Sequence, residues 1–93
     1  MTSEELERCI GTLLDLARAR GVRELHTGSR DYYWNVPTPD WVDMSKEPHL
    51  TVGSLEDDMA ELRKLLQEPE RASSVDLDRV AAMLRLISEQ LSR

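Results

Sequence analysis

The chain has 93 residues, of which 40% are hydrophobic and 32% are charged, and its formal net charge is −6. This length predicts one domain, residues 1–93, with a thin core that buries roughly 60–65% of the surface exposed on unfolding. The excess of acids argues against nucleic acids and anionic membranes as partners, because both are bound through clusters of Lys and Arg. The single cysteine excludes an intrachain disulfide. No apolar run is long enough for a membrane span, and the first residues do not form a signal peptide, so we expect a cytoplasmic protein.

Residues 3–20 are predicted to form an amphipathic helix. Thr2 and Glu5 have the spacing of a capping box, and Gly21 is placed to adopt the left-handed conformation that ends a helix. Gly11, inside the pattern, is a candidate for close approach by another backbone. Apolar residues recur at intervals of three and four and predict the face that packs on the core: Leu6, Cys9, Ile10, Leu13, Leu16 and Ala17.

Residues 22–52 carry the extended part of the chain. An alternating pattern at 32–36 and again at 49–52 predicts two short strands, and 22–26 is a candidate for a third. Pro37 and Pro39 end the first strand and begin an ordered loop, because neither can donate a ladder hydrogen bond. An isolated hairpin is marginal in water, so we expect helices to cover this sheet.

Two further helices are predicted near the C-terminus. Ser54 is the expected N-cap of the first, which Pro69 stops by residue 68. A polar linker of about five residues then turns the chain back into an antiparallel helix, from about 75 to 92, capped by Ser74 or Asp76.

The last helix has an apolar seam with strict three- and four-residue spacing, formed by Leu77, Val80, Leu84, Ile87 and Leu91. Met83 and Leu86 widen it. Two interpretations stay open: the seam packs against the other two helices, or it forms a homodimer through the C-terminal helix, as small domains often complete their cores by self-association.

Taken together, these elements predict an α+β fold. Its parts are an N-terminal helix, a small antiparallel sheet of two or three short strands with a proline-rich loop, and a C-terminal antiparallel helix pair, all sharing one core.

Few residues are suited to catalysis or metal binding. His26 and His49 are the two histidines, and their spacing does not match a metal site. Cys9 lies on the apolar face of the first helix and is interpreted as a buried, inert thiol. An enzyme would need His26 or His49 to converge with Tyr33 and an acid in a pocket. We therefore expect neither enzymatic activity nor a metal or other cofactor.

The aromatic segment is the best candidate for function. All four aromatic residues fall within ten positions: Tyr32, Tyr33, Trp34 and Trp41. One explanation of this cluster is that the aromatic residues supply bulk to a thin core. The other is that they form a contact surface, since Tyr and Trp are enriched in interface hot spots. The flanking acids are Asp31, Asp40 and Asp43.

From these features we predict a non-catalytic protein-interaction module that contacts an unidentified protein partner through residues 31–43. A narrower alternative is an immunity or antitoxin-type inhibitor, because an acidic face can occupy the basic cleft of a toxin.

Three short motifs resemble a group of small uncharacterised bacterial proteins of about this length. The motifs are Tyr32-Tyr33-Trp34-x-Val36-Pro37, Leu50-Thr51-Val52-Gly53-Ser54-Leu55-x-Asp57-Asp58 and Leu84-Arg85-x-Ile87. The resemblance covers roughly residues 30–90. It implies a related fold, and it implies no activity, cofactor or catalytic residue.

Overall fold

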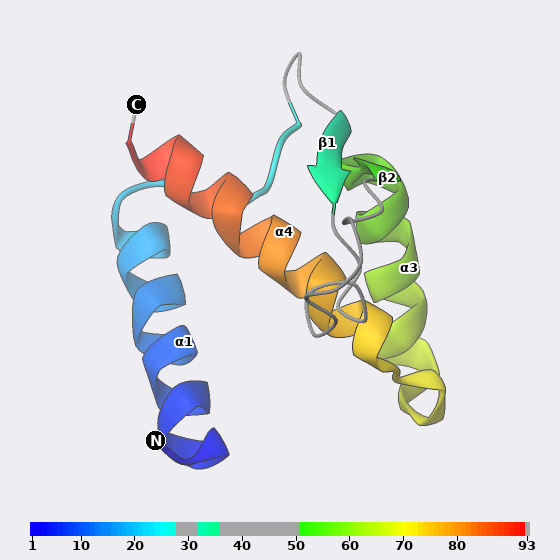
Figure 1. Ribbon diagram of the computed structural model, residues 1–93. Coiled ribbons are helices and arrows are strands. Elements are labelled where there is room, and N and C mark those ends of the chain that lie inside the picture. Colours follow the sequence, from blue (N-terminus) through cyan, green and yellow to red (C-terminus); the bar gives the residue numbers. More distant parts are fainter. Residues whose placement is uncertain (28–31, 36–50, 93) are drawn as a thin grey trace, which may run out of the picture.

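The computed structural model describes residues 1–27, 32–35 and 51–92. The described elements are three α-helices, one 3-10 turn and two short strands, in the order α1, β1, β2, α3, η1 and α4 (Figure 1). Helices α3 and α4 pack against each other, and α1 stands to one side of that pair (Figure 1). This arrangement leaves most of α1 outside the core.

Helix α1 spans Ser3–Ala19 and has the predicted caps at both ends. The Glu5 amide donates to the Thr2 hydroxyl at 3.1 Å, and the Thr2 amide donates to the Glu5 carboxylate at 2.9 Å, which completes a capping box. Gly21 has a φ of 91°, and the amide of Val22 donates to the carbonyl of Ala17 at 2.9 Å. These bonds satisfy the last turn of the helix and turn the chain toward α4.

The predicted α+β class is wrong, because the described residues are mostly helical. Extended structure among them is limited to β1, Tyr32–Asn35, and β2, Thr51–Ser54, which pair antiparallel with Tyr32 opposite Ser54. Residues 22–26, the candidate third strand, have no regular structure. A two-stranded ladder is marginal in water by itself, so the helices carry most of the described fold.

Helix α3 follows β2 directly and spans Leu55–Gln67. Ser54 is its N-cap, as predicted, and accepts a hydrogen bond from the Asp57 amide at 3.3 Å. The turn η1, Pro69–Arg71, then reverses the chain into α4, Ser74–Leu91. The N-cap of α4 is Ser73, and not Ser74 or Asp76 as predicted. The Ser73 amide donates to the Asp76 carboxylate at 3.0 Å, so Asp76 is the capping-box partner.

The core lies between α3 and α4. Its buried apolar residues are Leu55, Ala82, Met83 and Leu86, with Leu25, Met59 and Leu62 packed against them. Among the described residues, the core is built from aliphatic side chains, and of α1 only Ala17 is buried.

The buried face of α4 is not the predicted seam. Met83 and Leu86, which were expected only to widen the seam, are buried, whereas Leu77 is 72% exposed. Val80 and Leu84 are also exposed. The helix has two adjacent apolar stripes, and α3 covers the one that begins at Asp76 and continues through Met83 and Leu86. Packing against the other two helices, the first of the two interpretations, therefore does not hold for Leu77, Val80 and Leu84, and the homodimer interpretation stays a prediction.

Candidate functional site

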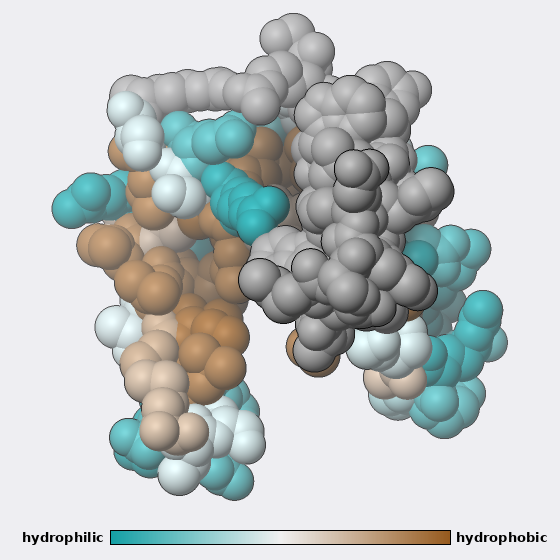
Figure 2. Space-filling view, viewed as in Figure 1, coloured by the Kyte–Doolittle hydropathy of each residue, from teal (hydrophilic) through white to brown (hydrophobic). Residues whose placement is uncertain are grey.

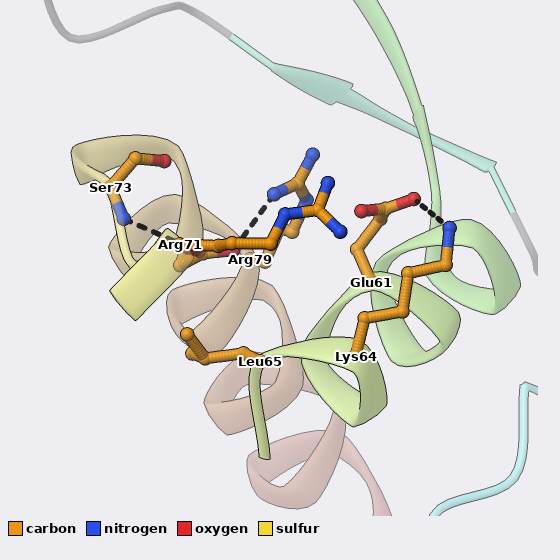
Figure 3. Close-up of a pocket in the computed structure, with 7 residues that line it drawn as sticks. Glu61, Lys64, Leu65, Arg71, Ser73 and Arg79 are labelled. Atoms are coloured by element: carbon orange, nitrogen blue, oxygen red, sulfur yellow. Dashed lines mark hydrogen bonds and ion pairs between the residues drawn. The ribbon is translucent and has the colours of Figure 1, made fainter. Parts of the chain in front are cut away.

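The first hollow of interest lies where α3, η1 and the start of α4 meet (Figure 3). It has a volume of about 180 Å³ and is mostly polar. Its lining residues come from all three elements: Glu61, Lys64 and Leu65 from α3, Arg71 from η1, and Ser73, Asp76 and Arg79 from the start of α4.

Arg79 holds the two helices together at this hollow. Its Nη1 donates to Asp76 Oδ1 at 2.8 Å, and its Nε lies 3.9 Å from Asp58 Oδ1 on α3. Both carboxylates are buried, with 8% of Asp58 and 9% of Asp76 exposed. Buried charges are tolerated only when they are paired and hydrogen-bonded, so these contacts fix the register of α4 on α3.

The carboxylates of this region are stabilised in their ionised form. The Ser73 amide, with a further contribution from Arg79, lowers the pKa of Asp76 below its ordinary value. A hydrogen bond from Lys64, at 3.1 Å, likewise lowers the pKa of Glu61. Each acid therefore remains charged at neutral pH and acts as a fixed negative partner.

The cations of the hollow are already neutralised. Lys64 pairs with Glu61, Arg71 pairs with Glu68 at 2.7 Å, and Arg79 pairs with the two buried aspartates. An anionic ligand would have to displace these carboxylates to bind. The arrangement is suited to joining helices, and within the described ranges no three His, Cys, Asp or Glu residues gather to hold a metal ion.

The second hollow is an apolar groove between α1 and α4, with a volume of about 410 Å³. Figure 2 shows hydrophobic side chains gathered over α1 and the neighbouring part of α4. The groove is open because α1 does not close onto α4: Leu13 is 59% exposed and Leu16 is 42% exposed. Its lining residues are Ile10, Leu13, Leu14, Leu16 and Arg20 from α1, and Leu84, Ile87, Ser88, Leu91 and Ser92 from α4 and its C-cap.

A third hollow lies beside residues 21–26 and Gln90. The Gln90 amide donates from Nε2 to the carbonyl of His26 at 3.1 Å and ties this segment to α4. The His26 ring lies in solvent, 3.8 Å from the exposed carboxylate of Glu24. His26 and Glu24 both line this hollow, and both side chains are largely exposed.

The predicted contact surface lies largely outside the described residues. Tyr32, Tyr33 and Trp34 form part of the backbone ladder of β1. Trp41 and the three flanking acids, Asp31, Asp40 and Asp43, fall outside the described ranges, and so does His49. The choice between a core and a surface role for the aromatic residues stays a prediction.

Two predictions about α1 are wrong. Cys9 is exposed, not buried, because the face of α1 on which it lies is not covered. Gly11 was a candidate for close backbone approach, but no described atom lies within 4 Å of a Cβ built there. Both differences have one cause, which is that α1 is not packed into the core.

Sequence reasoning missed two features of the candidate sites. Asp76 and Arg79 lie on the same face of α4 as Met83 and Leu86. Their helical spacing from these apolar residues could have predicted a charged contact at the edge of the core. The apolar groove was missed because the stripe on α1 was assigned to the core. The width of the apolar surface on α4 had left a homodimer through that helix open, but it did not indicate a groove shared with α1.

Comparison with protein families, with curated proteins and with solved structures finds no match. The resemblance to small bacterial proteins therefore stays a prediction. In the part of the chain that the structure describes, no helix combines the length and apolar character needed to cross a bilayer.

Proposed function

We propose that the chain is a non-catalytic protein-interaction module that binds through the apolar groove between α1 and α4. The observation that carries this proposal is the open groove itself, whose Leu13, Leu16 and Leu84 side chains are all exposed. Contiguous apolar surface of this kind, rimmed by polar residues, is typical of a protein–protein contact.

The shape and chemistry of the groove suit a helix. Two helices form its walls, so an amphipathic helix from a partner can lie along it with apolar residues at intervals of three and four. Arg20 and Ser92 place polar groups at the edge of the groove. A cation at that edge favours an acidic residue on the incoming helix.

The electrostatics of the polar hollow support a non-catalytic role. The shifted carboxylates there, Glu61 and Asp76, have lowered pKa values. A general acid at neutral pH needs the opposite shift, a pKa raised by burial or by a second acid. The charged groups of this hollow hold α3 and α4 together, and the apolar groove is left as the better candidate for binding.

The aromatic and acidic segment, residues 31–43, stays a second proposed contact surface on sequence grounds, because Tyr and Trp are frequent interface anchors. The immunity or antitoxin role rests on net charge alone. We place the module in the cytoplasm because its single cysteine is an exposed free thiol, which suits a reducing compartment.

Association through the groove can be tested by capture from a lysate of the native host to which an untagged copy of the chain has been added. The baits are the wild-type chain, Leu13→Glu in the groove and Leu66→Glu as the matched control. Leu66 is 84% exposed on α3 and does not line the groove. We expect Leu13→Glu to lose the captured proteins, whether foreign or the untagged copy, and Leu66→Glu to retain them. Equal capture by all three baits, or no capture by the wild type, would contradict the proposal.

A further inference from the structure

Helix α1 has little support from the rest of the chain. Of its 17 residues only Ala17 is buried, and Leu6, Leu13 and Leu16 are 50%, 59% and 42% exposed. An isolated helix of this length is marginal in water, and most helical stability comes from packing of the amphipathic face. The apolar face of α1 therefore requires a protein surface against it.

The charges of α1 indicate which surface that is. Glu4, Glu5 and Glu7 lie at its N-terminal end, and Arg18 and Arg20 lie at or just beyond its C-terminal end. A second α1 running antiparallel, with the crossing point between Thr12 and Leu13, brings Glu5 beside Arg20 of the second copy. A parallel alignment would instead place like charges together, which is unfavourable.

The apolar residues fit the same alignment. Leu13 lies next to the two-fold axis, and Leu16 lies beside Cys9 of the second copy. Because a two-fold interface uses the same patch twice, the second α1 occupies the groove between α1 and α4, and the first α1 occupies the equivalent groove of the second copy. The groove residues Leu84, which is exposed, and Ile87 and Leu91, which are half-buried, then complete a four-helix contact.

We propose that a second copy of this chain fills the groove, with the two α1 helices antiparallel. This inference rests on the proposed function, because it names the partner of the same groove. It differs from a dimer through α4 alone, since most of the contact comes from α1.

Sedimentation equilibrium of the purified chain, from low to high micromolar concentration, tests the association. We expect a monomer–dimer equilibrium that Leu13→Glu weakens by about 100-fold or more, because each dimer loses two central apolar contacts and gains two close like charges. Leu66→Glu should leave the equilibrium unchanged, and Arg20→Glu should weaken it. A cooperative urea unfolding transition in each variant must show that the α3–α4 core is intact, so that weaker association is not a loss of the fold.

Disulfide formation tests the direction of pairing. The proposed crossing point brings position 13 of one copy next to position 13 of the other, so Leu13→Cys in a Cys9→Ser background should cross-link on oxidation. The same crossing point separates the two Cys9 positions by about 10 Å along the helix, which is too far for a disulfide. Cross-linking of the wild type through Cys9 would overturn the antiparallel arrangement.

A chain that stays monomeric at every concentration overturns the inference. If that monomer still captures a foreign protein in a manner that depends on Leu13, the proposed function stands and only the identity of the partner is wrong. If capture is also absent, both are wrong.

Discussion

Asp76 shows how much a single residue contributes to this small fold. Its carboxylate accepts a hydrogen bond from the Ser73 amide at 3.0 Å and another from Arg79 at 2.8 Å. The first bond caps α4, and the second joins the cap to Arg79, which also lies against Asp58 on α3. One side chain therefore begins a helix and fixes that helix on its neighbour.

The lowered pKa of Asp76 predicts a loss of stability in acid. The folded chain holds the ionised form more strongly than the unfolded chain does, so the unfolded state binds more protons as the pH falls. The contribution of Asp76 is complete above the ordinary Asp pKa of about 4 and is lost as the pH falls through the lower folded value. We expect Asp76→Asn to be less stable than the wild type at neutral pH, and the difference to shrink toward about pH 3 in urea unfolding. A difference that is independent of pH would contradict this account.

Local sequence signals predicted the residues that act within their own element. Thr2, Glu5, Gly21 and Ser54 all perform the capping roles that their spacing indicated. The contact between Arg79 and Asp58 was not predictable in the same way. It joins two elements, and its geometry depends on how α4 is rotated against α3.

At the scale of the element, α4 shows why a seam of correct spacing can be assigned to the wrong partner. Its apolar residues cover two neighbouring stripes, and either could face a core. Helical periodicity defines the width of an apolar surface but not the direction from which another helix covers it. The α3–η1–α4 hairpin was predicted with nearly correct ends, and the rotation of α4 within it was not.

The two stripes of α4 predict losses of stability of very different size for the same Leu→Ala substitution. Leu86→Ala removes a side chain that is only 5% exposed and should lower the free energy of unfolding by about 2–5 kcal/mol. Leu77→Ala is the matched control, because Leu77 is 72% exposed and should change stability by no more than about 0.5 kcal/mol. Urea unfolding measures both. Comparable losses in the free energy of unfolding for the two variants would mean that the rotation of α4 against α3 differs from the one in the structure.

The fold class was predicted wrongly because an alternating pattern was given too much weight. The pattern at 32–36 indicates extended backbone, and the chain does form a ladder over Tyr32–Asn35. A pattern of this length does not say how many strands will join. Residues 22–26, which have no regular structure, reach α4 through Leu25 and the His26 carbonyl, so they contribute a connection to the helical core and not a strand.

At the scale of the whole molecule, the described residues include more apolar surface than the chain buries. The α3–α4 pair has a small core, while α1 and the outer stripe of α4 stay exposed around a groove of about 410 Å³. The sequence could predict that each of these faces is apolar. It could not separate a face that closes the core from one that meets another molecule, because both have the same periodicity.

Amide hydrogen exchange at two protein concentrations tests most directly whether the open face of α1 belongs to an interface between copies. In the proposed dimer, α1 gains its stability from association, so its amides should become better protected as the concentration rises above the dissociation constant. The amides of α3 and α4 that surround the buried core should be protected at both concentrations. If the protection of α1 equals that of α4 and does not depend on concentration, α1 is stabilised within one chain and the account of an intermolecular interface is wrong.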